Sequence, residues 1–295
     1  MSIWFVPRDA AARSMGADAV ASALEARGET VIRNGSRGML WMEPLVERAD
    51  DRQGPRVGWS NLSATQIDAG LPDEQAENFI GAVEEIEYLA KQNRWIYERV
   101  GITDPVDPED YEAHGGLTGL KNALSMSGGD VVQAVTDSGL RGRGGAGFPA
   151  GIKWRTVADQ PPVPHVGESK NAPAHKYICV NADEGDSGTF ADRILMEGDP
   201  FCLLEGMAIA AHAVGANRGL VYLRSEYPDA IATLQSAIWI AREQGWLGDN
   251  ILGSDLCFDV EIRVGAGSYV CGEETAMLES LEGRRGMVRA KPPLP

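Results

Sequence analysis

Three groups of residues in this chain have types and spacing suited to ligand chemistry. The first is a glycine-rich stretch, GRGGAGFPAGIKW, at residues 142–154. A backbone with so few side chains can approach a phosphate or a flat ring closely, and glycine reaches positive φ at little cost. Gly142, Gly144 and Gly147 also match the G-x-G-x-x-G pattern of dinucleotide sites, which is a weak signal on its own.

The neighbours of this stretch disfavour a standard dinucleotide site, which needs a strand before its first glycine and a helix after its last. The preceding segment instead carries valines at helical spacing between residues 131 and 135. Because Phe148, Lys153 and Trp154 lie among or beside the glycines, a flexible linker is also disfavoured. The sequence predicts a loop that wraps over a ligand.

The second group is the acidic segment VNADEGDSGTFADR, residues 180–193. An apolar segment that suits a strand precedes it, which places its polar residues at the carboxyl end of a sheet, where open α/β sheets bind ligands. These residues are Asn181, Asp183, Glu184 and Asp186. Clustered carboxylates repel one another unless they accept hydrogen bonds from donors, and ribose or ribityl hydroxyls are suitable donors. A solvated turn or a calcium loop stays open as an alternative, although the spacing does not match an EF-hand.

The third group is RVGAGSYVCGEETAMLESLEGRRG, residues 263–286. We expect a strand that ends at Gly265, a glycine turn, and a helix that begins near Glu273. The free N–H groups at the start of such a helix favour an anionic ligand or the helix's own acidic residues. Stabilisation of the helix end would explain Glu273 and Glu274 without a ligand. It would not explain the glycines and Tyr269 that precede them.

The elements that position these groups read as an α/β domain over residues 117–295. Alternation of apolar strands with helices predicts a mostly parallel, doubly wound sheet. The expected strands are 177–181, which we expect to be buried, 220–223 and 258–264. The expected helices are 130–137, 200–214, 227–244 and 273–281, and residues 152–157 can form another.

Residues 1–72 read as a smaller α/β domain with a thioredoxin-like arrangement. Its first strand is expected at 3–6, and Asp9 can cap a helix that stops at Gly28. The apolar face of this helix would carry Ala12, Met15, Ala19, Ala23 and Leu24. Strand-like segments follow at 30–33, 39–47 and 56–62. No cysteine precedes Cys179, so the domain can hold neither a dithiol nor a cluster, and we interpret it as a docking or packing domain.

The stretch between the two domains, residues 73–116, reads as a helix and a linker. An apolar stripe predicts a helix over 73–100. The stripe consists of Phe79, Ile80, Val83, Ile86 and Leu89. Residues 103–116 are rich in proline, glycine and acid, which is typical of a linker.

Composition bounds the class of protein. The net charge of −16 argues against binding to DNA or to an anionic membrane surface, and plain solubility accounts for most of it. The chain has no signal peptide and no apolar run that could span a bilayer, so we expect a cytoplasmic protein. Four cysteines without C-x-x-C spacing predict reduced, mostly buried thiols and no metal site.

Together, the three groups and the closing KPPLP of residues 291–295 resemble the flavin-binding, 51-kDa-type subunit of respiratory complex I. They also resemble the related diaphorase subunits of NAD-linked hydrogenases and formate dehydrogenases. The resemblance covers residues 111–295 densely. The cysteine-free thioredoxin-like domain of residues 1–72, hereafter the leader, is most similar to that of the β subunits of molybdenum-dependent, NAD-reducing formate dehydrogenases.

This resemblance implies an N-terminal thioredoxin-like domain and a Rossmann-like domain that binds FMN, with NAD(H) stacked on the flavin. The activity it implies is hydride transfer between nicotinamide C4 and flavin N5, and Glu184 and Glu273 would be the catalytic residues. The flavin cradle would be Gly142, Arg143, Gly144, Gly145 and Gly147, with Lys153 nearby. The ribityl chain and ring edge would contact Asn181, Asp183 and Glu184. The flavin–nicotinamide pocket would be lined by Tyr269, Gly272, Glu273 and Glu274. The rest of the nucleotide would contact Phe148 at the adenine, Asp186 at the adenosine ribose, and Lys291.

The resemblance also implies partners: a 2Fe–2S γ-type subunit and a molybdenum-containing formate dehydrogenase α-type subunit, without nucleic acid or membrane. The family continues with an Asn-Asn-Val-Glu-Thr segment, a ubiquitin-like domain and a helical bundle that binds a 4Fe–4S cluster. We therefore expect this chain to be a fragment, with the cluster in the missing part. The alternatives are the same module of an NAD-reducing hydrogenase or of complex I, and a non-catalytic nucleotide-binding scaffold.

Overall fold

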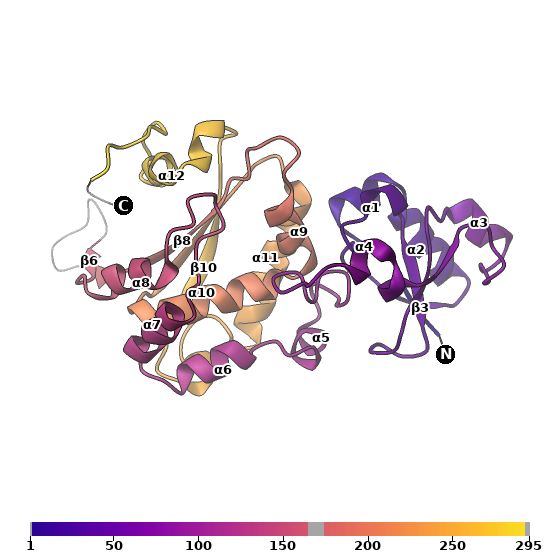
Figure 1. Cartoon of the computed structure of the whole chain (residues 1–295), viewed down its shortest axis with the longest axis horizontal. Coiled ribbons are helices and arrows are strands. Elements are labelled where there is room, and N and C mark those ends of the chain that lie inside the picture. The colour runs from indigo at the N-terminus through magenta and orange to yellow at the C-terminus, as the bar shows by residue number, and fades with distance from the viewer. Residues whose placement is uncertain (1, 165–173, 293–295) are drawn as a thin grey trace. The chain divides into compact units, whose positions relative to one another are not determined.

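The computed structural model describes residues 2–164 and 174–292 (Figure 1), so the closing KPPLP motif is described only as far as Pro292. The chain forms two compact units. The first unit comprises Met1–His114, Phe190–Pro200 and Ala232–Leu234, and the second comprises Gly115–Thr189, Phe201–Ile231 and Gln235–Pro295.

The first unit contains a five-stranded mixed sheet in the order β2-β1-β3-β4-β5. Its strands are β1 (Ile3–Phe5), β2 (Thr30–Ile32), β3 (Val46–Ala49), β4 (Val57–Trp59) and β5 (Phe79–Ala82). The β1 and β2 strands are parallel, and the remaining neighbours are antiparallel, as in the expected thioredoxin-like arrangement. The expected strand at 39–47 begins only at Val46, because Leu40–Met42 forms a 3-10 turn (η1) and Pro44 has no N–H to donate to a ladder.

Two helices replace the single helix expected after β1, because Gly16 adopts a φ of 99° and breaks the chain between them. The helices of this part are α1 (Ala10–Ser14), α2 (Ala17–Ala26) and α3 (Ala64–Ala69). The break turns the apolar face, so that Met15 and Ala19 are exposed while Val20 is buried. Gly28 ends the second helix as expected, with a φ of 84°.

The helix expected over residues 73–100 is wrong. The segment contains β5, the 3-10 turn η2 (Val83–Glu85) and the single-turn helix α4 (Glu87–Ala90). Val83 and Leu89 are buried, as the apolar stripe suggested. However, Gly81 adopts a φ of 77° and pairs with Gly58 of β4, so the backbone bonds to a neighbouring strand instead of to itself.

The linker expected at 103–116 is also folded. Helix α5 (Pro108–Ala113) begins at Asp107, whose side chain accepts hydrogen bonds from the amides of Glu109 and Asp110. Tyr111 of this helix is buried. Proline and acidic residues are favoured in the first turn of a helix, so the composition that suggested a linker marks a helix start.

A buried ion cluster lies in the first unit. Glu47 accepts hydrogen bonds from Arg37 at 2.8 and 2.9 Å and from Arg56 at 3.1 Å, and all three side chains are almost fully buried. Burial raises the pKa of Glu47, but the two guanidinium groups outweigh it and hold that pKa below its usual value. The carboxylate therefore stays ionised inside the domain.

The second unit contains a three-stranded parallel sheet in the order β10-β9-β8. The strands are β8 (Tyr177–Ala182), β9 (Arg218–Leu223) and β10 (Asp259–Val264). The helices are α6 (Thr118–Leu124), α7 (Gly128–Asp137), α8 (Ala150–Ala158), α10 (Pro200–Val214), α11 (Pro228–Glu243) and α12 (Glu274–Leu281). The short elements are β6 (Val163–Pro164), β7 (Ala174–His175), η3 (Ile251–Gly253) and η4 (Tyr269–Gly272). These bounds confirm the expected strands and helices to within a few residues, and the sheet is parallel throughout.

Burial in the second unit differs from expectation at β8 and at the thiols. Cys179 and Asn181 on β8 are exposed, because one face of this outer strand is open. Cys257 is exposed as well, and only Cys271 is fully buried, although all four cysteines are free thiols. No helix among the described residues is long and apolar enough to cross a bilayer.

Candidate functional site

The glycine-rich stretch forms a hairpin between two helices. Helix α7 precedes it and α8 follows it, which confirms that it is not the strand-to-helix turn of a dinucleotide fingerprint. The N–H of Gly142 donates to the carbonyl of Phe148 at 2.9 Å, and that of Ala150 donates to Leu140 at 2.9 Å. The Arg141 guanidinium donates to the Gly147 carbonyl at 2.8 Å. These bonds fix the two ends of the loop.

The tip of this hairpin presents bare backbone to open space. A Cβ added at Gly144, Gly145 or Gly147 would meet no heavy atom within 4 Å. Gly145 and Gly147 adopt φ values of 98° and 59°, a region that residues with side chains rarely enter. The loop can therefore lie against a flat or anionic ligand without an intervening side chain.

Helix α8 carries Lys153 into the site and packs closely on α7. A Cβ at Gly151 would lie 2.3 Å from Oγ1 and 2.7 Å from Cα of Thr136, so the two helices approach at a point where only glycine fits. Lys153 Nζ lies 5.9 Å from the ring centroid of Phe148 and 3.2 Å from Oε2 of Glu274. The hairpin is thus connected to the start of α12.

The start of α12 and Lys291 form an ion network. Lys291 Nζ lies 2.9 Å from Oε1 of Glu273 and 2.6 Å from Oε1 of Glu274. Hydrogen bonds from Lys291 and then from Lys153 lower the pKa of Glu274, although partial burial opposes them. Lys153 and Lys291, which are far apart in sequence, therefore meet the adjacent Glu273 and Glu274 in one place.

Glu273 is the N-cap of α12. Its Oε2 accepts hydrogen bonds from the amides of Thr275 at 2.8 Å and Ala276 at 3.0 Å, and from the Thr275 hydroxyl at 2.5 Å. Burial raises the pKa of Glu273, but these bonds and Lys291 outweigh it and lower that pKa to about 2. The carboxylate is therefore ionised at neutral pH and cannot act as a proton donor.

The acidic segment meets the same place from the carboxyl end of β8. Asn181 Nδ2 donates to the Gly272 carbonyl at 2.8 Å, and a Cβ at Gly185 would lie 3.0 Å from the ring of Tyr269. Asp183 is 5% exposed, and burial raises its pKa. The Tyr269 ring itself is 72% exposed. A large aromatic surface is therefore exposed to solvent beside the acidic segment.

The sequence analysis missed two residues of this site, Arg224 and Tyr227. Arg224 donates to the Glu184 carbonyl at 2.5 Å, and the Tyr227 hydroxyl donates to Glu184 Oε2 at 3.1 Å. Burial and the neighbouring Glu184 carboxylate raise the pKa of Tyr227, so its hydroxyl remains a donor. Their position could have identified both residues from the sequence, because they follow the carboxyl end of β9, the strand next to β8.

Two predicted site residues are not joined to the others. Arg143 and Asp186 are exposed on their loops. Within the described ranges, no hydrogen bond or ion pair connects either side chain to another predicted site residue. Those ranges likewise contain no group of three or more histidine, cysteine or acidic side chains that could hold a metal ion.

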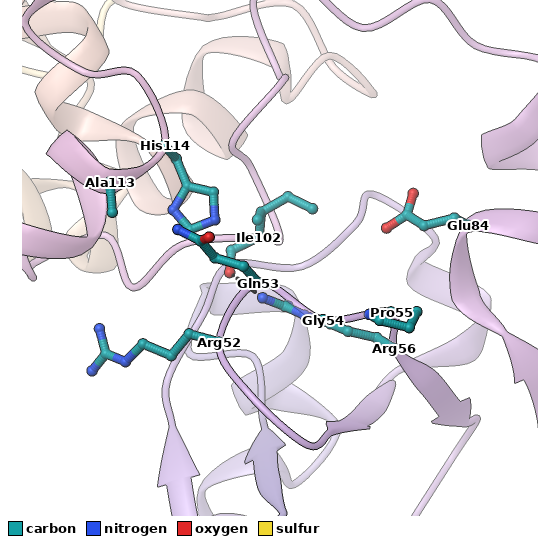
Figure 2. A pocket seen from close by; sticks show the side chains of 9 residues that line it. All are labelled: Arg52, Gln53, Gly54, Pro55, Arg56, Glu84, Ile102, Ala113 and His114. Carbon is teal, nitrogen blue, oxygen red and sulfur yellow. Dashed lines mark hydrogen bonds between the residues drawn. The ribbon is translucent and has the colours of Figure 1, made fainter.

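A separate cavity of about 450 Å³ lies in the first unit (Figure 2). Its lining consists of Arg52, Gln53, Gly54, Pro55, Arg56, Glu84, Ile102, Ala113 and His114. Both arginines bind neighbours in the same unit: Arg52 pairs with Asp107, and Arg56 pairs with Glu47. The charges that line this cavity therefore hold the domain together, and no predicted site residue belongs to it.

An open glycine loop and a charged cluster at the carboxyl edge of a parallel sheet are features of a nucleotide-binding α/β protein. The chain matches the family described as the Nuo51 FMN-binding domain over residues 135–295, more than half of its length. It therefore belongs to that family, which comprises the 51-kDa-type subunits of complex I and their diaphorase relatives.

Individual relatives agree with this family. NADP-reducing hydrogenase subunit HndC of Solidesulfovibrio fructosivorans is 49% identical over 205 residues, which cover 70% of this chain and 39% of the relative. An NADH-quinone oxidoreductase subunit of Rhizobium meliloti is 52% identical over 201 residues, which cover 68% and 45% of the two chains. A crystal structure of an NAD+-reducing NiFe-hydrogenase in the H2-reduced state superposes with a TM-score of 0.51 and 28% identity. That superposition covers 100% of this chain and 48% of the other. The chain thus spans less than half the length of these relatives.

The residues at this site fit the cofactor of the family, FMN. The hairpin leaves open space above bare backbone, as a flat ring requires. The Asn181 amide and the two lysine ammonium groups are hydrogen-bond donors, and Glu184 supplies an acceptor for hydroxyl groups. Both the shape and the donor set are therefore suited to a phosphorylated flavin.

Proposed function

We propose that this chain is the FMN- and NAD(H)-binding diaphorase module of a cytoplasmic, NAD-dependent formate dehydrogenase. In this role it catalyses hydride transfer between NAD(H) and FMN and relays electrons to or from iron–sulfur clusters. Its partners are the 2Fe–2S γ-type and molybdenum-containing α-type subunits. The observation that carries the proposal is the convergence of four separate segments on one sheet edge. These segments are the glycine hairpin with α8, the end of β8, the start of α12, and Lys291.

FMN, when bound, supplies the hydride chemistry at its ring, and this chain supplies binding, orientation and charge. The hairpin allows close approach of the ring to the backbone, and Lys153 and Lys291 offer cationic groups to phosphates. Glu184 offers an acceptor that Tyr227 holds in place at 3.1 Å. The exposed Tyr269 ring offers a stacking surface for the nicotinamide side. Glu273 is held ionised and acts through its charge and by capping α12.

The proposed nucleotide is NAD(H). Asp186 is an exposed carboxylate in the acidic segment, and a carboxylate accepts hydrogen bonds from ribose hydroxyls. The same charge repels the 2′-phosphate of NADP(H). Phe148, 37% exposed at the end of the hairpin, offers its ring to the adenine.

The proposal of formate as the partner reaction is supported by the leader domain. The first 178 residues contain no cysteine, so the leader holds no cluster, as in the formate dehydrogenase β subunits that it resembles. The alternative is the equivalent module of an NAD-reducing hydrogenase, which the superposition with such an enzyme over the whole chain favours. Metal analysis of the purified complex separates the two, since molybdenum supports formate and nickel supports hydrogen.

The test is a purification of the complex followed by its flavin absorption spectrum and NADH-dependent ferricyanide reduction. Loss of a hydrogen bond to a charged group costs about 1.5–3 kcal/mol, so Glu184→Gln should lower kcat/KM for NADH roughly 10- to 100-fold. Glu243→Gln, an exposed substitution on α11, is the matched control and should retain full activity. A flavin-free complex without ferricyanide reduction would overturn the proposal and favour a non-catalytic scaffold.

A further inference from the structure

The acidic segment contains a hydrogen-bonded turn. The Thr189 N–H donates to the Asp186 carbonyl at 3.2 Å, which closes residues 186–189 into a four-residue turn. Gly188, at the third position, adopts a φ of 83°, which matches the value that a type II turn requires there. Asp186, the first residue of the turn, is exposed and carries the carboxylate that we propose for the adenosine ribose. The backbone position of Asp186 therefore depends on where Thr189 is held.

One hydroxyl group, that of Tyr227, contacts both ends of the segment from Glu184 to Thr189. Tyr227 Oη lies 3.1 Å from Glu184 Oε2 and 3.3 Å from the Thr189 carbonyl oxygen. A phenol has a single proton to donate, so the hydroxyl donates to one of these acceptors at a time. Burial and the Glu184 carboxylate raise the pKa of Tyr227, so that proton is kept at neutral pH. All three residues belong to the second unit.

Tyr227 is itself held in place by the sheet and by a long helix. It is 8% exposed and is the N-cap residue of α11, which begins at Pro228. The Tyr227 N–H donates to the Arg224 carbonyl at 3.2 Å, and the Arg224 N–H donates to the carbonyl of Ala182, the last residue of β8, at 3.1 Å. The Arg224 guanidinium lies over the Tyr227 ring, 5.3 Å from its centroid. The Tyr227 hydroxyl therefore has a fixed place beside β8, whereas the turn that it contacts is exposed.

The start of the segment has contacts of its own. Arg224 Nη1 donates to the Glu184 carbonyl at 2.5 Å, and a Cβ at Gly185 would lie 3.0 Å from the ring of Tyr269. These contacts do not involve the Tyr227 hydroxyl, so they remain when that hydroxyl is removed. The contact between Tyr227 and Thr189, by contrast, joins the end of the segment to the same sheet edge. Loss of the hydroxyl should therefore release the turn while the start of the segment stays in place.

We propose that Tyr227 is a positioning residue that sets the preference of the site for NAD(H) over NADP(H) through the turn that carries Asp186. The hydroxyl holds Thr189, and Thr189 holds the backbone of Asp186. The Asp186 carboxylate then accepts hydrogen bonds from the ribose or repels a 2′-phosphate. Tyr227 needs no contact with the nucleotide in this role. The inference rests on the proposed function for its ligand, but the closure of residues 186–189 is a property of the chain itself.

Tyr227→Phe tests the proposal, because it removes one oxygen atom and keeps the ring. Tyr88→Phe in the first unit is the matched control, since it removes the same atom from a tyrosine that is 47% exposed. Asp186→Asn and the double variant with Tyr227→Phe complete a double-mutant cycle. The readouts are hydrogen exchange of the Thr189 amide in the full chain without flavin, and KM and kcat of the purified complex for NADH and for NADPH.

We expect Tyr227→Phe to accelerate exchange of the Thr189 amide about fivefold, since the net contribution of one hydrogen bond corresponds to roughly that factor. The ratio of kcat/KM for NADH to kcat/KM for NADPH should fall by a similar factor, mainly because KM for NADH rises at little changed kcat. Loss of the bond to Glu184 affects both nucleotides alike and cancels in this ratio. Tyr88→Phe should match the wild type in both readouts.

The cycle separates positioning from a purely structural role at the start of α11. In the Asp186→Asn background, Tyr227→Phe should change the ratio less than about twofold, because the carboxylate that the turn positions is gone. An undiminished effect there would show that Tyr227 acts independently of Asp186 and would overturn the proposal. Unchanged Thr189 exchange or an unchanged ratio in Tyr227→Phe would overturn it too, whether or not the variant loses stability. If the wild-type complex oxidises neither nucleotide, the proposed function and its specificity fail together, and the Thr189 exchange rate still decides whether Tyr227 holds the turn.

Discussion

The N-cap role of Glu273 leads to a quantitative prediction for Glu273→Ala. Replacing an N-cap acceptor with alanine costs about 1 kcal/mol, and the interaction of an ionised cap with the helix dipole contributes roughly 0.3–1 kcal/mol more. The carboxylate accepts from two amides and one hydroxyl, so we expect the full loss, about 1–2 kcal/mol at pH 7. Glu273→Gln keeps a neutral acceptor and should lose only the part that depends on charge.

The pH dependence follows from the pKa of Glu273, which is about 2 in the folded chain against an ordinary value of 4.5. A lowered pKa stabilises the fold above the unfolded value and loses that effect as the pH falls toward the folded one. The difference between wild type and Glu273→Gln should therefore be constant at and above pH 6 and shrink between pH 4.5 and 2.

Urea unfolding of the full chain at several pH values measures both the loss of stability in Glu273→Ala and the pH dependence of the difference between wild type and Glu273→Gln. Glu243→Ala, an exposed change on α11, is the control and should lie within about 0.5 kcal/mol of the wild type. Equal stability of Glu273→Ala and wild type at pH 7 would refute the stabilising N-cap role of Glu273. A wild-type advantage that persists unchanged to pH 2 would refute its dependence on charge.

Three further predictions follow from packing and charge. Glu47→Gln removes the one carboxylate that Arg37 and Arg56 share, which leaves Arg37 only its pair with Glu84, and should lower unfolding stability by about 3–5 kcal/mol; a loss below 1 kcal/mol would contradict the buried cluster. Gly151→Ala overpacks the contact with Thr136 and should destabilise by about 1–3 kcal/mol in denaturant unfolding, whereas Gly206→Ala in open space on α10 should stabilise by about 0.5–1 kcal/mol. The same sign for both glycine substitutions would contradict this account. Asp186→Asn should raise kcat/KM for NADPH relative to NADH about tenfold in steady-state assays, and an unchanged ratio would argue against contact with the ribose.

Sequence periodicity was sufficient to predict the bounds of an element that buries one face along its length. Helices α10, α11 and α12 and strands β9 and β10 lie within a few residues of their expected bounds. The failures are of another kind. Apolar residues spaced three and four apart around Gly81 suggested a helix, but a strand edge elsewhere in the chain offered the backbone better partners. Similarly, residues 103–116 were expected to be a linker because of their proline and acidic residues, but these residues start helix α5, in which Tyr111 is buried.

Candidate residues were found where a local motif marks them and were missed where only the fold brings them in. Lys153, Glu274 and Lys291 each belong to a marked motif, and the structure places both lysines against Glu274. Arg224 and Tyr227 were missed because no local pattern marks them, and only the register of β9 beside β8 brings them to Glu184. The roles of these residues toward FMN and NAD(H) remain proposals.

The hydrogen bond between Ala10 and Glu197 joins residues 187 positions apart, and this has a consequence for synthesis of the chain. At about 5–20 residues per second, the ribosome takes roughly 10–40 s to make the segment between them. During that time the first unit lacks helix α9 (Ala191–Gly198), so the Ala10 amide that follows β1 has no Glu197 carboxylate to donate to. A nascent chain stalled before residue 190 should therefore be more susceptible to proteolysis in its leader than one stalled beyond residue 230, so the leader completes its folding only after most of the chain has been made.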